Sequence, residues 1–178
     1  STGVFNGLDP GTYSVDMRDA NGCGPVESNT FIITQPEAIT ISSSSYTDII
    51  CNNDSDGSIS VTATGGTAPL VYTLNPGAIQ VNGDGNFTGL SAGTYTVNVT
   101  DANGCPDVIE GPFTIVNPDP IIITGENETD VKCKGAADGT ITITATGGTG
   151  SLYYTLTPGP VIQTDDGLFT GLAPDTYS

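Results

Sequence analysis

The sequence predicts an all-β fold made of tandem immunoglobulin-like Greek-key β-sandwich repeats, each of about 82 residues. Apolar and polar residues alternate with a period of two along most of the 178 residues, as in strands that bury one face. Turn-forming Gly, Pro, Asn and Asp residues interrupt the alternation about every 8 to 12 residues, which is typical of a sandwich. Long motifs also return at one constant spacing. Apolar residues nowhere recur at the helical period of about 3.6, so helix is expected to be nearly absent.

The repeat is visible in two pairs of motifs. GTYSVDMRDANGC begins at Gly11 and returns as GTYTVNVTDANGC at Gly93. DGSISVTATGGT begins at Asp56 and returns as DGTITITATGGT at Asp138. The two offsets are identical, and no insertion interrupts the register. Such an exact phase indicates a tandem array of one structural unit.

Prolines at positions 36 and 118 mark the predicted boundaries between repeats. Residues 1–36 are then the C-terminal part of one repeat, residues 37–118 a complete repeat, and residues 119–178 the N-terminal part of the next. The chain is therefore expected to be a window on a longer array. The seam around Pro118 and Pro120 is short and stiff, which predicts an extended rod.

The complete repeat is predicted to contain seven short strands. Ile59, Val61 and Ala63, for example, alternate with Ser and Thr and are expected to face the core. In the order A to G, the predicted strands are 38–46, 58–64, 69–75, a short 78–82, 86–90, 94–101 and 108–117. The other side chains predicted to face inward are Ile39, Ile41, Leu70, Tyr72, Leu74, Tyr95, Val97, Val99, Phe113 and Ile115.

The segment LSAGTY that ends at Tyr95 has the pattern of a tyrosine corner. In that motif a Tyr at the start of strand F returns its hydroxyl to the upstream backbone. Tyr13 and Tyr177 occupy the same place in their repeats. All three are predicted to be structural residues.

Composition excludes several classes of function. Lys and Arg total 3 against 20 Asp and Glu, a net charge of -17. Such a chain is repelled by polyanions, so binding to nucleic acid or directly to a membrane is not expected. The chain has no His, and no acidic pair is singled out for hydrolysis, so no enzyme is expected. The acidic surface is expected to keep a long exported chain soluble and to discourage strand pairing between neighbours.

Cysteine usage predicts disulfides. A sandwich of this size without Trp has a small core and is only marginally stable without a covalent staple. Each repeat has one Cys before strand B and one in the F–G turn. Paired Cys at fixed places indicate an oxidising compartment. None of them lies in a CxxC cluster, which a metal site would need. The cysteines are Cys23, Cys51, Cys105 and Cys133.

Two disulfide connectivities follow from the predicted topology. Strands B and F run in the same direction, and strand F spans about 25 Å, which places Cys51 and Cys105 at opposite poles. A disulfide needs Cα atoms about 5.5 to 6 Å apart. The preferred pairing therefore joins the A–B loop Cys of one repeat to the F–G turn Cys of its successor. A bridge between Cys51 and Cys105 within one repeat is the alternative.

The run from Cys51 to Gly57, the following SISVTATGGTAPLVYTL, and the run FTGLSAGTYTVNVTDANGC that begins at Phe87 resemble the SprB-type repeat of giant surface adhesins from gliding bacteria. The resemblance implies export to the bacterial cell surface by type IX secretion. It also implies long chains of tandem domains that form flexible filaments, bind substrata and are moved by a gliding motor. It assigns no functional site to these residues.

On this basis the chain is expected to be a structural stalk segment of an adhesin filament. Its expected partners are neighbouring repeats, lateral filament contacts, and surface polysaccharide or substratum reached through other parts of the protein. The alternative is a repeat that itself binds ligand, either a glycan or in a Ca²⁺-dependent way.

A calcium site is the sharpest form of that alternative. Asn52, Asp54 and Asp56 alternate before a Gly, as in the first half of a calcium loop. The equivalent loop of the next repeat keeps only the ligand at Asp138, and Ala63 stands where the last acidic ligand belongs. A solvated turn is therefore the preferred interpretation, and no cofactor is expected.

Overall fold

The computed structural model describes residues 3–76, 81–159, 161–164 and 166–178, and these residues form strands, turns and loops without any helix. All strand pairs are antiparallel. The predicted all-β class is confirmed. The described residues also contain no helix long and apolar enough to cross a membrane.

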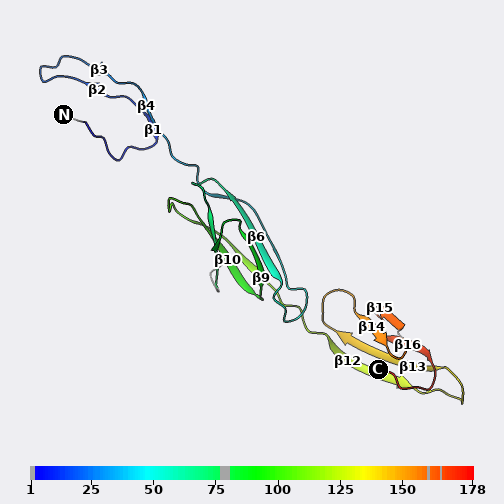
Figure 1. Cartoon of the computed structure of the whole chain (residues 1–178). Coiled ribbons are helices and arrows are strands. Elements are labelled where there is room, and N and C mark those ends of the chain that lie inside the picture. Colours follow the sequence, from blue (N-terminus) through cyan, green and yellow to red (C-terminus); the bar gives the residue numbers. More distant parts are fainter. Residues whose placement is uncertain (1–2, 77–80, 160, 165) are drawn as a thin grey trace.

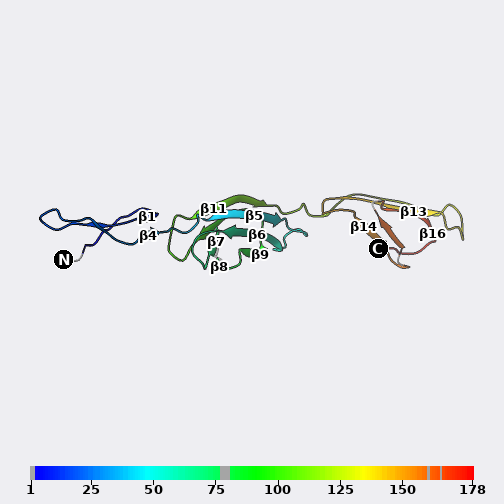
Figure 2. The ribbon, with the colours of Figure 1, turned by 90° about the horizontal axis from the view of Figure 1, so that it is seen from above.

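The strands gather into three bodies arranged in a line. Figure 1 shows an N-terminal hairpin at one end, a central unit around β6, β9 and β10, and a C-terminal unit at the other end. The turned view of Figure 2 shows the same line of bodies along one long axis. The two chain ends therefore lie toward opposite ends of an elongated molecule.

The central unit contains two antiparallel sheets around one core. The first sheet has the order β5–β6–β9, with β5 at Thr40–Thr47, β6 at Gly57–Thr64 and β9 at Asn86–Leu90. The second has the order β11–β10–β7–β8, with β11 at Val108–Ile115, β10 at Gly93–Thr100, β7 at Val71–Asn75 and β8 at Val81–Asn82. These strands match the predicted A to G closely.

The fourth predicted strand, D in the order A to G, does not lie beside E, where strand D of an immunoglobulin sandwich lies. Residues 78–80 of that prediction lie outside the described residues, and the strand is described only at Val81–Asn82. It pairs with β7, through Tyr72 opposite Asn82, and not with β9. The segment follows β7 after a short connection, and adjacent strands joined in this way usually pair with each other. A strand labelled D, which belongs beside E, was therefore the wrong assignment for it.

The inward-facing residues of the alternating strands form the core of the central unit. The six largest fully buried side chains come from both sheets and interdigitate between them: Phe87, Ile59, Ile115, Val61, Val97 and Val99. Burying one such side chain stabilises the fold by about 1.5–3 kcal/mol. Ile49, in the loop after β5, and Leu90, the last residue of β9, are also buried, although neither continues the alternation. Residues that close the ends of a sandwich carry no periodic signal.

At two positions of the central unit, close packing leaves room only for glycine. A Cβ on Gly57 would come within 2.8 Å of Cγ2 of Ile115, so Gly57 makes room for the end of β11. Gly85 has φ +70, and a Cβ there would clash with the carbonyl oxygen of Val61. A side chain at Gly57 would push β11 away, and one at Gly85 would displace the backbone of β6.

The N-terminal hairpin has the same register as the last two strands of the central unit. Its strands are β1 at Gly11–Tyr13, β2 at Asp16–Met17, β3 at Val26–Glu27 and β4 at Phe31–Ile33. Tyr13 faces Phe31, as Tyr95 faces Phe113 in the β10–β11 pair. Among described residues the hairpin has no sheet packed against it, and Phe31 is 53% exposed, whereas Phe113 is 6% exposed.

The C-terminal unit repeats the first part of the central one, at the spacing that the sequence motifs share. Its larger sheet has the order β12–β13–β16, with β12 at Ile122–Thr129, β13 at Gly139–Thr146 and β16 at Leu168–Leu172. A second sheet pairs β14, Tyr153–Leu156, with β15, Val161–Thr164. Of the counterparts of β10 and β11, its described residues include only 175–178, where Ser178 exchanges two backbone hydrogen bonds with Thr157. Ile141 and Ile143 are consequently only half-buried, although their equivalents Ile59 and Val61 are fully buried.

Candidate functional site

The three tyrosines predicted to be structural make the same hydrogen bond. Tyr13 donates its hydroxyl to the carbonyl oxygen of Asp9 at 2.8 Å. Tyr95 donates to Ser91 and Tyr177 to Ala173, each at 3.0 Å. Every bond spans four residues, and it fixes the chain at the entrance to a strand. These tyrosines therefore close a loop and leave their hydroxyls occupied.

The DANGC turn between β10 and β11 is organised by one carboxylate. Oδ1 of Asp101 accepts the backbone N–H groups of Asn103 and Cys105, each at 3.0 Å, and Oδ2 accepts that of Thr67 at 3.0 Å. Asp101 is the one buried charged residue among those described. In the hairpin, Asp19 binds the N–H groups of Asn21 and Cys23 in the same way.

These bonds shift the acid–base equilibria of the turn. The N–H of Cys105, followed by that of Thr67, lowers the pKa of Asp101, and burial opposes them only in part. The N–H of Cys23 lowers the pKa of Asp19. Partial desolvation, followed by the charge of Asp101, raises the pKa of the Cys105 thiol. At neutral pH the turn therefore holds a carboxylate beside a protonated thiol.

The loop between β5 and β6 uses its acidic residues for structure. Oδ1 of Asp56 accepts the N–H of Ile50 at 3.1 Å, and Asp138 makes the equivalent bond to Lys132 at 3.1 Å. Asn52 donates Nδ2 to the carbonyl oxygen of Pro118 at 2.7 Å and accepts from Asn53. No group of three or more His, Cys, Asp or Glu side chains that could hold a metal exists among the described residues. Of the three candidate calcium ligands, Asn52, Asp54 and Asp56, the structure thus gives Asn52 and Asp56 hydrogen bonds within the protein.

This loop also forms the joint between the central and C-terminal units. Besides the bond from Asn52 to Pro118, the backbone N–H of Asn53 donates to Oδ1 of Asn117 at 2.9 Å. Thr149, in the loop between β13 and β14, donates its hydroxyl to the carbonyl oxygen of Ile50 at 2.9 Å. Two bonds thus hold the connecting segment, and a third crosses directly from one unit to the next.

The four cysteines lie at the poles of the units. All are exposed, and none of the four is bonded to another within the described chain. Cys51 lies in the joint loop, whereas Cys105 lies in the turn at the other end of β10, beside Thr67. The bridge between Cys51 and Cys105 is not made in this structure. Pairing with the cysteine of another repeat stays a prediction.

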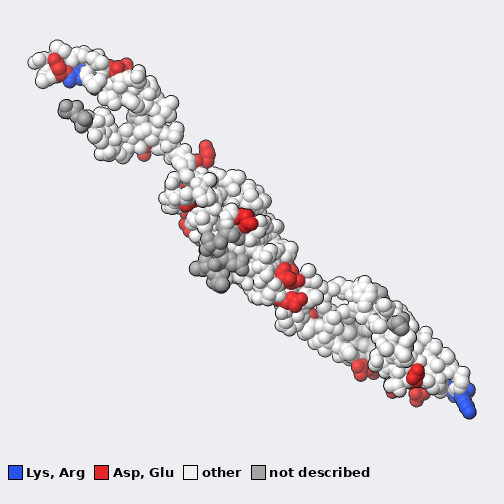
Figure 3. Space-filling view, in the orientation of Figure 1, with Lys and Arg blue, Asp and Glu red and all other residues white. Residues whose placement is uncertain are grey.

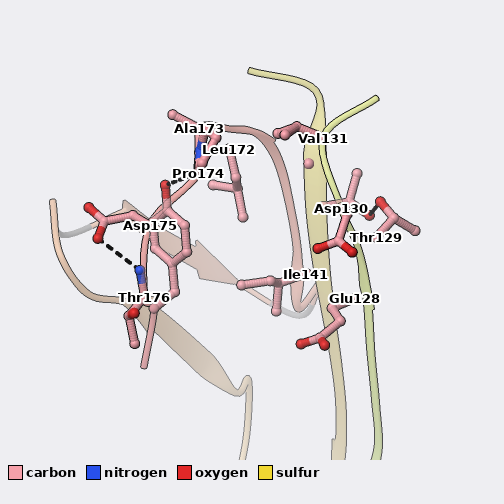
Figure 4. A pocket seen from close by; sticks show the side chains of 13 residues that line it. Glu128, Thr129, Asp130, Val131, Ile141, Leu172, Ala173, Pro174, Asp175 and Thr176 are labelled. Atoms are coloured by element: carbon pink, nitrogen blue, oxygen red, sulfur yellow. Dashed lines mark hydrogen bonds between the residues drawn. The ribbon is translucent and has the colours of Figure 1, made fainter. Parts of the chain in front are cut away.

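Two grooves lie along the C-terminal unit. The first, of about 440 Å³, is lined by residues 128–131, 139–141 and 172–177. Figure 4 shows Ile141 and Leu172 pointing into it, with Glu128 and Asp130 along one wall. The second, of about 730 Å³, is lined in part by Ile143, Leu156 and Phe169. Both grooves therefore open onto the apolar interior of this unit.

Charge is distributed along the rod without concentrating in one cleft. In the view of Figure 3, acidic side chains are scattered over all three bodies, and the basic ones lie at the two ends. The chain has three basic residues in total, which are Arg18, Lys132 and Lys134. Each is within five residues of a cysteine in the sequence.

The joint and the turn carboxylates were not identified from the sequence as interacting residues. Asp101 could have been found, because DANGC is repeated and an Asp two residues before Asn-Gly often caps the turn that follows. Thr149 carries no such signal, since its partner Ile50 belongs to a different repeat, and Asn117 carries none, since its partner Asn53 is distant in the sequence. Only the three-dimensional arrangement of the units reveals them.

Residues 43–79 and 125–161 match the family model described as the SprB repeat. The resemblance to SprB-type repeats is confirmed for these two segments, which begin at equivalent positions of successive repeats. The first segment covers most of β5 and all of β6 and β7, and the second covers the equivalent strands of the C-terminal unit. No curated protein and no solved structure matches the chain.

Proposed function

We propose that this chain is a stalk segment of a long, secreted cell-surface adhesin filament that serves surface attachment and gliding motility. The repeats of such a stalk set its length and stiffness, and contact with polysaccharide or substratum is made by other parts of the protein. The matches to the SprB repeat support a surface-adhesin type of repeat region. Export by type IX secretion belongs to the same proposal.

The repeating unit of the stalk is an immunoglobulin-like Greek-key sandwich, with residues 37–118 as its complete copy. The sheet orders β5–β6–β9 and β11–β10–β7–β8 support this assignment, because they correspond to A–B–E and G–F–C followed by one further edge strand. The end of one unit precedes this copy, and the start of the next follows it. The equivalent strands of the central and C-terminal units support the same boundaries.

The hydrogen bonds at the joint between the central and C-terminal units are the main support for a stalk. A stalk must hold consecutive domains in line, and the bond from Thr149 to Ile50 connects two units without a flexible linker. The bond from Asn52 to Pro118 ties down the connecting segment beside it. Neighbouring acidic units also repel, although salt screens this effect beyond about 8 Å.

A covalent joint follows from the same contacts. Thr149 contacts the loop that contains Cys51, and its equivalent Thr67 contacts the F–G turn that contains Cys105. The F–G turn of the unit after the joint is therefore directed at the loop of Cys51. A disulfide between the A–B loop of one unit and the F–G turn of its successor would lock the rod in an oxidising compartment.

The stiffness of the joint is tested by small-angle scattering on the whole chain. Thr149→Val together with Asn52→Ala removes two hydrogen bonds at the joint, each worth about 0.5–1.5 kcal/mol. We expect a shorter maximum dimension with an unchanged melting temperature. Thr170→Val, an exposed residue on β16, is the control and should scatter like the parent chain. Equal profiles for all three proteins would mean that these bonds do not set the shape.

The role as a stalk is tested by an adhesion assay. Beads coated with the purified chain should bind glass and polysaccharide no better than beads coated with an unrelated acidic protein, with or without Ca²⁺. Saturable adhesion that depends on a glycan or on Ca²⁺ would overturn the stalk and support a repeat that binds ligand itself.

A further inference from the structure

The solvent side of the first sheet of the central unit carries no charged residue. Ile59 and Phe87 point from β6 and β9 into the core, so the residues that alternate with them point to solvent. The two complete cross-strand rows on this side consist of small polar side chains: Ser45, Ser60 and Asn86, and Thr47, Ser58 and Thr88. The other outward pairs between β5 and β6 also consist of Ser and Thr. We name the solvent side of β5, β6 and β9 the hydroxyl face.

The acidic residues of the central unit lie away from the hydroxyl face. Its Asp residues are in the loops between strands, and Glu37 precedes β5. Glu110 lies on β11 of the other sheet, and it accepts the hydrogen bond of Ser44, which points to the opposite side of β5. In a chain with net charge -17, this face therefore offers a neutral surface on which a like-charged molecule meets little repulsion.

The hydroxyl face recurs in the C-terminal unit, on the solvent side of β12, β13 and β16. Glu126 and Glu128 flank Asn127 on β12, so their side chains point to the other side of the sheet. Two apolar side chains enter the face here: Ile122 is 55% exposed and Leu168 is 39% exposed. The second copy of the face is thus also uncharged, and it is more apolar than the first.

The polar groups of the hydroxyl face already hydrogen bond to one another. Three cross-strand pairs do so in the central unit: Thr47 and Ser58 at 2.8 Å, Thr40 and Thr64 at 3.1 Å, and Ser60 with Oδ1 of Asn86 at 2.8 Å. A polar group that keeps a partner costs much less to remove from water than an unpaired one. Neither charge nor these hydroxyls therefore oppose burial of the face.

The solvent side of the second sheet differs in this respect. Oδ1 of Asn98 is buried there and has no hydrogen-bond partner among the described residues. Thr94 and Thr114, the outward pair of β10 and β11, are 3.5 Å apart, which is long for a hydrogen bond. Covering this side would leave more polar groups unsatisfied, so the hydroxyl face is the better surface for a contact.

We propose that the hydroxyl face packs against the same face of a second copy of this chain. A hydroxyl both donates and accepts, so two copies related by a two-fold axis can pair without a separate complementary surface. Sheets that pack face to face keep their strands within about 30° of each other. Because β6 and β13 run along the long axis of the molecule (Figure 1), the two rods lie side by side. The proposal is independent of the stalk function, since a stalk that stays single is still a stalk.

The size of the face predicts a weak contact for each repeat. Strands β5 and β6 have eight residues each. Eight residues span about 26 Å and three strands about 14 Å, so one face covers about 350 Å² at most. A specific interface buries about 800 Å² on each partner, which one repeat does not supply. Stable lateral association therefore requires that the contact adds up over several repeats.

The first experiment measures self-association of the whole chain by sedimentation equilibrium, with a reducing agent present so that the cysteines do not contribute. The weight-average mass should rise toward that of a dimer between about 50 μM and 1 mM. Raising NaCl from about 10 to 300 mM should strengthen association, because salt screens the repulsion between acidic loops. An interface built on ion pairs would weaken instead, and that result would contradict a neutral contact.

Two double variants add the same charge to different faces. Ser45→Asp with Asn127→Asp places a carboxylate in the equivalent row of each hydroxyl face, and it should weaken association at least about 10-fold. Ile109→Asp with Thr114→Asp is the matched control on the solvent side of the second sheet, and association should stay within about threefold. All four residues are exposed in the free chain, so both variants should keep its circular dichroism spectrum.

Nitrogen-15 NMR spectra at the same two concentrations locate the contact. The largest concentration-dependent shifts should occur at the backbone N–H groups of Ser45, Ser60 and Asn127. Those of Thr73 and Ile109, on the second sheet, should stay constant.

Four results would overturn the inference. One is a monomer at every concentration and salt level, and another is equal association of the two double variants. The third is a set of shifts confined to the second sheet or to the loops at the poles. The fourth is retention of the chain on dextran, a neutral polysaccharide, that is lost in the Ser45→Asp, Asn127→Asp variant, because the face would then bind a glycan.

Discussion

Asp101 shows how one side chain organises a whole turn. Its two carboxylate oxygens accept three backbone N–H groups, two from its own turn and one from Thr67 in the neighbouring loop. A carboxylate that accepts several such bonds is stabilised in its ionised form, which is why the pKa of Asp101 is lowered. The turn is therefore sensitive to pH through a single group.

Acid should weaken the fold through Asp101. Because the pKa of Asp101 is lower in the folded chain than its ordinary value of 3.8, the stabilisation is complete above that value and is lost as the pH falls through the folded-state pKa. Asp101→Asn also removes an acceptor, since its amide nitrogen would face an N–H donor. Urea titrations should give a lower midpoint for Asp101→Asn at pH 7. The two midpoints should converge as the pH falls through the folded-state pKa of Asp101.

The Cys105 thiol reports on the same carboxylate. Partial desolvation and the charge of Asp101 raise the pKa of Cys105, so Asp101→Asn should lower it. The rate of alkylation of Cys105 by iodoacetamide, measured against pH in a chain whose other cysteines are Ser, gives this pKa directly. An unchanged profile would show that the charge of Asp101 does not act on the thiol.

Alanine substitutions at two glycines with similar backbone angles distinguish the cost of a left-handed backbone from the cost of a steric clash. Gly85 has φ +70 and Gly104 has φ +66, but an added Cβ clashes with Val61 at Gly85 and meets nothing within 4 Å at Gly104. Gly104→Ala should therefore cost about 1–2 kcal/mol, from the left-handed backbone alone. Gly85→Ala should cost clearly more, because the sheet must also move. Equal free energies of unfolding would contradict the clash.

At the scale of the element, the same strand has different surroundings in different parts of the chain. Phe87 in β9 is fully buried, whereas its equivalent Phe5 is 63% exposed. Phe87→Ala should lower the free energy of unfolding by about 3–5 kcal/mol. Phe5→Ala should change it by less than about 0.5 kcal/mol in the monomer. Chemical denaturation at low protein concentration measures both.

Sequence reasoning predicted the elements better than the contacts between them. The alternation of Ile59 and Val61 with Ser and Thr placed β6 within one residue, because a strand with one buried face leaves a periodic pattern. The letter D was wrong for β8, which pairs with β7, since two residues do not carry enough pattern to choose a sheet. The loop of Asp56 was interpreted as a solvated turn, although Asp56 holds that loop through a backbone N–H, and the burial of Asp101 was not predicted.

At the scale of the whole molecule, the acidic charge is a collective property. Asp84 caps a turn through the N–H of Asn86, and Glu110 accepts one exposed hydrogen bond from Ser44. Asp84→Asn or Glu110→Gln keeps a hydrogen-bond acceptor at each position. Either substitution should change the free energy of unfolding by less than about 0.5 kcal/mol. Neutralising about ten acidic residues together should promote precipitation, measured as turbidity. Loss of solubility after one substitution would indicate a specific site.

The positions at which the chain enters and leaves the central unit determine how that unit responds to a pulling force. The chain enters β5 at one pole and leaves β11 at the other, and these two strands point the same way. Ile49 and Asp48 both hold Val116, where the end of β5 meets the end of β11. Force on the two ends would slide β5 along β11 and load these bonds simultaneously, in shear. A hairpin pulled at its open end instead unzips one bond at a time. Because forced unfolding is governed by the unfolding rate, this geometry gives the unit mechanical resistance beyond its equilibrium stability.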